Sequence, residues 1–110
     1  MKLFNVTQNM AITKKLVTAK SVGDKIVGLI GKKERKSPAM YFQTRWGIHT
    51  FGMKFPLTII VCNSTFVVQA IKWNLLPNRV YFWKPRWSNI FELPAGKYPV
   101  SIGDKLELIT

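Results

Sequence analysis

Two side chains in this sequence have the chemistry that proton transfer needs, His49 and Glu92. His49 is the only histidine, and Glu92 stands between the apolar Phe91 and Leu93. An imidazole titrates near neutral pH and a buried carboxylate has a raised pKa, so the two could act as base and acid. The alternative is structural: a packed histidine ring bonded to the backbone, and a buried carboxylate paired with a cation. No spacing supports a hydrolytic triad, and no clustering of His, Cys, Asp and Glu predicts a metal or a cofactor.

A second group of candidates lies in the segment 73–87, which mixes aromatic side chains, basic side chains and prolines. Aromatic faces beside cationic groups are typical of proteins that bind single-stranded nucleic acid, and they also suit carbohydrate rings or a peptide. The alternative is that the segment folds over one end of the sheet and its rings fill the core. Together with two residues from the centre of the chain, the candidate ligand-binding residues are Arg45, His49, Arg79, Trp83, Lys84, Arg86 and Trp87.

The charge balance favours an anionic partner. The chain carries 17 Lys and Arg against 5 Asp and Glu, which gives a net charge of +12. Such a charge attracts nucleic acid or an anionic membrane surface, but by itself it governs encounter rather than specificity. The alternative explanation is a strongly solvated surface with no polyanion partner.

Length and cysteine content point to a single domain in a reducing compartment. The 110 residues suit one core spanning 1–110, and Cys62 is the only cysteine. Its place in an apolar run predicts a buried thiol rather than a nucleophile. The N-terminus lacks the apolar region of a signal peptide, and no stretch approaches the ~20 apolar residues of a membrane span. We therefore expect a cytoplasmic protein, with its oligomeric state left open.

Alternating short segments predict a mainly antiparallel β-fold. Leu57–Cys62 is almost wholly apolar, which predicts a central strand buried on both faces. Asn63 and Ser64 form a turn signal, so Thr65–Trp73 is expected to return as the second strand of a hairpin. Further strands are predicted at Lys2–Val6, Met10–Ala19, Pro38–Gln43, Gly47–Met53, Ile90–Leu93 and Lys105–Ile109.

One short helix is predicted near residues 21–31. Ser21 can cap its start, Asp24 lies near the positive end of the helix dipole, and Gly31 stands where the helix would end. Because one helix cannot cover both faces of a parallel sheet, the predicted class is all-β, an antiparallel small barrel or sandwich with this single helix.

Four short motifs occur in order along the chain. They are Gly28-Leu29-Ile30-Gly31-Lys32, the run Gly47–Leu57, Phe91-Glu92-Leu93-Pro94-Ala95-Gly96 and Ile102-Gly103-Asp104-Lys105. They resemble the motifs of a prokaryotic family known as domain of unknown function 192. The resemblance runs from about Thr18 to Leu108 and implies a small, mostly β domain with a short helix, with no cofactor and no reaction. One position departs from the pattern, because the family usually has an acid where this chain has Thr58.

Three functions are open at this point. The leading hypothesis is a non-enzymatic binding or accessory domain, for a protein partner or another ligand, centred on the segment 73–87 with Arg45 and His49. The second is a binder of single-stranded nucleic acid or of a ribonucleoprotein surface, driven by the positive charge. The third is an enzyme that uses His49 and Glu92.

Overall fold

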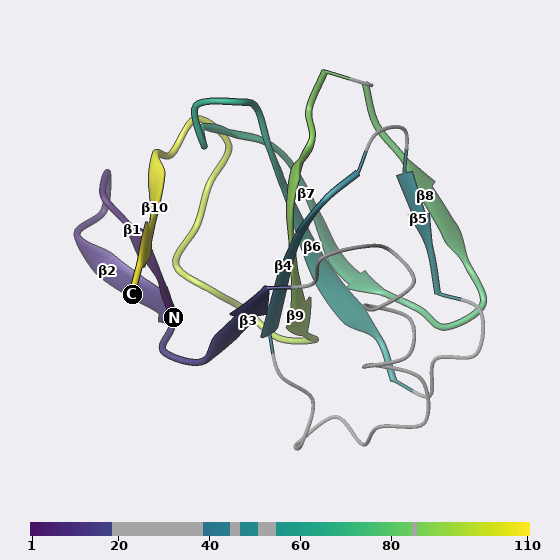
Figure 1. Cartoon of the computed structure of the whole chain (residues 1–110). Coiled ribbons are helices and arrows are strands. Elements are labelled where there is room, and N and C mark those ends of the chain that lie inside the picture. Colours follow the sequence, from purple (N-terminus) through teal and green to yellow (C-terminus); the bar gives the residue numbers. More distant parts are fainter. Residues whose placement is uncertain (19–38, 45–46, 51–54, 85) are drawn as a thin grey trace.

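The part of the chain that the structure describes forms three β-sheets (Figure 1). The computed structural model describes residues 1–18, 39–44, 47–50, 55–84 and 86–110. Its strands are β1 (Lys2–Asn5), β2 (Met10–Thr13), β3 (Leu16–Thr18), β4 (Ala39–Gln43), β5 (Gly47–His49), β6 (Leu57–Cys62), β7 (Val68–Leu75), β8 (Val80–Phe82), β9 (Asn89–Pro94) and β10 (Leu106–Ile109). A central sheet of order β3-β4-β9-β6-β7 is covered on one face by the sheet β10-β1-β2 and on the other by the ribbon β5-β8.

Strand β6 is an interior strand of the central sheet, with all six of its residues buried. It pairs antiparallel with β9 on one side and with β7 on the other. Ile59 and Val61 pack into the core beneath the ribbon β5-β8, whereas Ile60 and Cys62 pack into the core beneath the three-stranded sheet. The predicted central strand Leu57–Cys62 is confirmed, and it lacks a polar face because a layer covers each side of the sheet.

The all-β class is confirmed for the residues that the structure describes. Within them none of the three sheets closes on itself, so of the two predicted architectures the barrel is wrong and the layered one holds. The central sheet keeps β3 and β7 as edge strands, which a closed barrel would have paired. The predicted helix near residues 21–31 lies outside the described residues, as does the end of the predicted strand Gly47–Met53. No helix in the described ranges is long and apolar enough to pass through a bilayer.

The predicted single strand Met10–Ala19 is wrong in one respect, because the chain changes sheet within it. It bends at Lys14 and forms β2 in the small sheet and β3 in the central sheet. The hydroxyl oxygen of Thr13 accepts a hydrogen bond from the backbone N–H of Lys15 at 3.4 Å, which stabilises the bend. Strand β3 then pairs parallel with β4. In the sequence, the three consecutive polar residues Thr13, Lys14 and Lys15 interrupt the period-two alternation at the bend.

The ribbon β5-β8 includes a strand, Val80–Phe82, that is not among the strands predicted from the sequence. The two strands of the ribbon approach closely, because a side chain at Gly47 would collide with the carbonyl oxygen of Tyr81. The Thr50 hydroxyl accepts from the backbone N–H of Arg79 at 2.8 Å and donates to a carbonyl between β7 and β8 at 2.7 Å. These bonds hold the ribbon against the end of β7.

A buried carboxylate, Asp104, ties the small sheet to the loop before β10. Its Oδ2 accepts hydrogen bonds from Asn5 Nδ2 at 2.7 Å, Gln8 Nε2 at 2.7 Å and the backbone N–H of Ser101 at 2.9 Å. Burial opposes ionisation, but the bonds from Asn5, Ser101 and Gln8 outweigh it and lower the pKa of Asp104 below its ordinary value. The motif that contains Gly103 and Asp104 therefore has a structural role.

Candidate functional site

The aromatic residues of the segment 73–87 divide between core and surface. Trp83 is only 8% exposed and lies in the core beneath the ribbon, with its ring centroid 5.7 Å from that of Tyr81. Phe82, its neighbour in the sequence, is 69% exposed. The prediction that Trp83 offers a stacking face to a ligand is therefore wrong for the described structure. The alternative stated above, in which rings of this segment fill the core, applies to Trp83.

The C-terminal part of the segment borders a hollow in the surface. The hollow has a volume of about 400 Å³ and is lined by Asn63, Ser64, Gln69, Arg86 and Trp87, and we call it the Arg86–Trp87 hollow. Trp87 is half-buried and packs against the core beneath the ribbon. Lys84 lies with its Nζ 5.4 Å from the centroid of the Trp87 ring, within cation–π range. A backbone hydrogen bond of 3.0 Å from Trp87 N–H to the Lys84 carbonyl keeps the two residues together.

A buried amide network supports this hollow from behind. Asn89 is buried at the start of β9, and its Nδ2 donates to the carbonyl of Asn63 at 2.9 Å. Its Oδ1 accepts from the Tyr41 hydroxyl at 2.7 Å and from Gln43 Nε2 at 3.1 Å. Burial raises the pKa of Tyr41, so its phenol stays protonated and donates. The β6–β7 turn is thus joined to β9 and β4, which gives the hollow a preformed wall.

The Arg86–Trp87 hollow has a positive rim, and no carboxylate is among the described residues that line it. Arg86 lines it, and the exposed Lys84 stands beside it. The described acids are elsewhere: Glu92 is buried in β9, Asp104 is held by the small sheet, and Glu107 is on β10. The arrangement can therefore attract an anion and present part of an indole ring to a planar group.

Arg79 belongs to a different part of the surface. It is exposed and lines a second hollow of about 310 Å³ between the ends of β7 and β8, together with Lys72 and Tyr81. This hollow shares no lining residue with the Arg86–Trp87 hollow. The structure therefore does not bring Arg79 together with Arg86 and Trp87 in one site.

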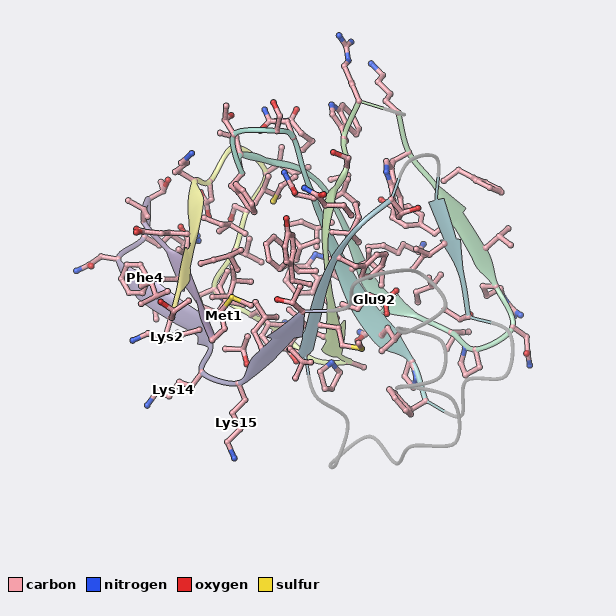
Figure 2. All side chains as sticks on the ribbon, viewed as in Figure 1. Met1, Lys2, Phe4, Lys14, Lys15 and Glu92 are labelled. Carbon is pink, nitrogen blue, oxygen red and sulfur yellow. The ribbon has the colours of Figure 1, made fainter. Side chains whose placement is uncertain are left out.

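The candidate acid Glu92 lies in the interior. It is 1% exposed and pairs across the sheet with Met40 of β4 and Ile59 of β6. Figure 2 shows it at the centre of the molecule, whereas Lys14 and Lys15 extend into solvent. It follows Ile90 by two residues and so shares the sheet face that the ribbon β5-β8 covers.

The other two candidates from the centre of the chain are described only in part. His49 belongs to β5, where its backbone pairs with Val80, and its side chain lies outside the described structure. Arg45 lies outside the described residues altogether. The proposed pairing of His49 with Glu92 in an enzyme stays a prediction. In the described ranges, no group of three or more His, Cys, Asp and Glu side chains is placed to hold a metal ion.

Cys62 has the properties of a core residue. It is fully buried at the end of β6, and burial raises the pKa of its thiol to about 12, although Lys105 acts in the opposite direction. Because the thiolate is the reactive form, the native thiol is expected to be inert.

We expect Cys62 in the native protein at pH 8 to react with iodoacetamide about a thousandfold more slowly than the same residue in the unfolded chain, because so little thiolate is present and the sulfur is covered. Mass spectrometry after timed labelling, with and without guanidinium chloride, measures both rates. Equal rates in the two conditions would show that the thiol is accessible and would contradict its place in the core.

Three residues of the Arg86–Trp87 hollow were not identified as functional from the sequence. The sequence predicts a turn at Asn63 and Ser64 and places Gln69 in the returning strand, without assigning any of them to a binding site. The hairpin β6–β7 and the segment before β9 are far apart in the sequence, and their meeting depends on the pairing of β6 with β9. The turn signal at Asn63 was the only local hint that this end of the hairpin carries polar side chains.

Comparison with known proteins identifies the fold and goes no further. No family model matches the chain, and no curated protein matches it. The structure is similar to a crystal structure from Sinorhizobium meliloti of a protein provisionally described as a transcription regulator (TM-score 0.78, 19% identity, 96% of this chain and 89% of that one). It is also similar to a protein of unknown function from Novosphingobium aromaticivorans (TM-score 0.78, 17% identity, 97% and 82%).

Proposed function

We propose that this protein is a binding module whose Arg86–Trp87 hollow takes single-stranded nucleic acid. The observation that carries the proposal is the half-exposed Trp87 ring next to Lys84 and Arg86, in a hollow whose described lining residues include no carboxylate. The net charge of +12 supports the proposal by favouring encounter with any polyanion. The description of the Sinorhizobium neighbour as a transcription regulator agrees with it, although at 19% identity that likeness extends to the fold alone.

The chemistry of each group gives it a distinct task in such a complex. A base stacks on the solvent side of the Trp87 indole, a contact worth about 1–3 kcal/mol per base. The ammonium of Lys84, which now lies over that ring, moves to a neighbouring phosphate, and Arg86 binds a second one. The Nδ2 of Asn63, whose Oδ1 is already bonded within the turn, and the amide of Gln69 can bond to base edges or sugar hydroxyls. Sequence preference is expected to be weak, because stacking accepts every base.

We expect Trp87→Ala to weaken binding of a labelled twelve-nucleotide single strand by about 5- to 100-fold at fixed salt, because the stacking face is lost. Arg86→Gln should instead make the salt dependence less steep. The negative slope of log affinity against log salt should shrink in magnitude by about 0.7, as expected for one lost phosphate contact. Fluorescence anisotropy over a salt series measures both quantities.

The matched controls are Phe82→Ala, which removes an exposed ring outside the hollow, and Lys15→Gln, which removes a remote charge. Both should bind like the unaltered protein. Since Trp87 also packs on the core, circular dichroism must show that Trp87→Ala is folded. If affinity falls with salt but all four variants bind alike, the protein attracts polyanions by net charge only and the proposal is wrong.

We further propose that the chain belongs to the family of unknown function that its motifs resemble, and that it acts in the cytoplasm. Two motifs have roles in the described structure that support the family proposal. The segment Phe91–Gly96 supplies most of β9 and the turn after it, and Ile102–Lys105 supplies the turn that Asp104 holds. The alternatives of a protein partner and of an enzyme using His49 and Glu92 stay predictions.

A further inference from the structure

An irregularity in β7 turns two adjacent side chains toward one residue of β6. Leu57 pairs with Leu75 and Ile59 pairs with Lys72, so Trp73 and Asn74 together stand opposite Thr58 alone. This two-against-one pairing is a β-bulge, and within it Asn74 adopts the left-handed conformation, with φ of 55°. Bulges redirect side chains, and here the bulge is beside the turn that follows β9.

Three side-chain hydrogen bonds hold that turn. The backbone N–H of Gly96 donates to Asn74 Oδ1 at 3.2 Å, and the hydroxyl of Thr58 donates to the Gly96 carbonyl at 3.2 Å. The hydroxyl of Tyr98 donates to the carbonyl of Pro94 at 2.6 Å. Two strands, β6 through Thr58 and β7 through Asn74, therefore hold the turn at Gly96 beside the bulge. The space between bulge and turn is preformed. Thr58, the position that departs from the family pattern, supplies one of these bonds.

The space is a hollow of about 230 Å³ lined by Trp73, Asn74, Lys97 and Tyr98, which we call the Trp73–Tyr98 hollow. The rings of Trp73 and Tyr98 line it. The Trp73 side chain is 39% exposed, whereas tryptophan is highly buried on average. Apart from the Tyr98 hydroxyl, which already donates to the Pro94 carbonyl, the side chains that line the hollow can offer three donors to a ligand. They are the indole N–H, the Nδ2 of Asn74, whose Oδ1 is already bonded, and the ammonium of Lys97. None of the described residues that line the hollow carries a carboxylate.

We propose that the Trp73–Tyr98 hollow binds a compact apolar group that carries a single carboxylate. The aromatic walls suit an apolar body such as a phenyl ring, and the donors with one cation suit an acceptor of charge −1. A phosphodiester chain fits less well, because one lysine stands at the hollow and the volume is small. The carboxylate could belong to a free small acid or to the C-terminus of a polypeptide ending in an apolar residue. The site shares no lining residue with the Arg86–Trp87 hollow and does not depend on its function.

Titration with phenylacetate, followed by NMR through the indole N–H signal of Trp73, tests this inference. The signal is assigned with Trp73→Phe. We expect a saturable shift with phenylacetate and at least about tenfold weaker binding of phenylacetamide, which has the same body without the charge. Lys97→Gln should weaken phenylacetate binding about tenfold and leave phenylacetamide binding unchanged, whereas Lys15→Gln, at a remote exposed lysine, should change neither.

Peptides that end in phenylalanine, with a free or an amidated C-terminus, separate the two sources of the carboxylate. Tighter binding of the free-ended peptide than of phenylacetate assigns the hollow to a polypeptide terminus, and equal or weaker binding assigns it to a free acid. The inference is overturned if no carboxylate gives a saturable shift, if phenylacetamide binds as well as phenylacetate, or if Lys97→Gln has no effect. Binding of the twelve-nucleotide strand by Lys97→Gln, measured in parallel, keeps this result separate from the function of the other hollow.

Discussion

Replacing Phe91 with alanine should lower the free energy of unfolding by about 4 kcal/mol, the cost typical of removing a fully buried phenylalanine. Phe91 has no exposed surface and lies in the core between the central sheet and the three-stranded sheet. Its ring stacks on Tyr41 at 5.1 Å between centroids and contacts Phe66 at 6.2 Å. The substitution leaves a cavity at the centre of this aromatic cluster, and covering layers on both faces limit how far the sheet can relax.

The chain offers a matched control in Phe82→Ala, which makes the same chemical change at a residue that is 69% exposed. Its effect should stay within about 0.5 kcal/mol. Urea unfolding followed by circular dichroism gives both values. Domains typically have about 5–15 kcal/mol of stability, so Phe91→Ala should remove between about a quarter and most of it. Similar costs for the two variants would show that Phe91 is not enclosed as described.

Asp104→Asn should lower the free energy of unfolding at pH 7 by about 3 kcal/mol, because hydrogen bonds to an ionised group are worth more than neutral ones. The carboxylate receives three donors, from Asn5, Gln8 and the backbone of Ser101. An asparagine in its place has a single accepting oxygen. If that oxygen accepts all three bonds, the NH₂ group either faces another donor or is left without a partner. The bonds that Asp104 makes join the β1–β2 turn to the loop before β10, so we expect the small sheet to loosen first.

The pH dependence of this effect has a defined sign. The pKa of Asp104 is lower in the folded protein than its ordinary value of 3.8, so the folded state favours the ionised form. Its contribution is complete above the unfolded pKa and is lost as the pH falls through the folded pKa. The stability difference between the unaltered protein and Asp104→Asn should therefore be constant from pH 7 to about pH 5 and shrink below about pH 4. Urea unfolding at several pH values measures it, and a difference that grows toward acid pH would contradict the network.

The local pattern of the chain was enough to predict the central strand and its hairpin. Leu57–Cys62 is apolar at every position but one, which only a strand covered on both faces allows in an all-β protein. The burial of Cys62 followed from the same run, and the turn at Asn63 followed from side-chain chemistry, since its Oδ1 accepts from the backbone N–H groups of Thr65 and Val67 at 3.0 Å. These features depend on neighbours in the sequence.

Tertiary structure alone decided which side chains could meet a ligand. Trp83 and Trp87 look equivalent in the sequence, yet one lies in the core and the other borders a hollow, because the pairing of β8 with β5 turns Trp83 inward. The bulge that directs Trp73 and Asn74 to the turn after β9 exists only in the register between β6 and β7. Residue types and short-range spacing determine strands and turns, because those depend on local sterics and alternation. The two hollows depend on how distant strands pair, and a pairing register is a property of the packed molecule.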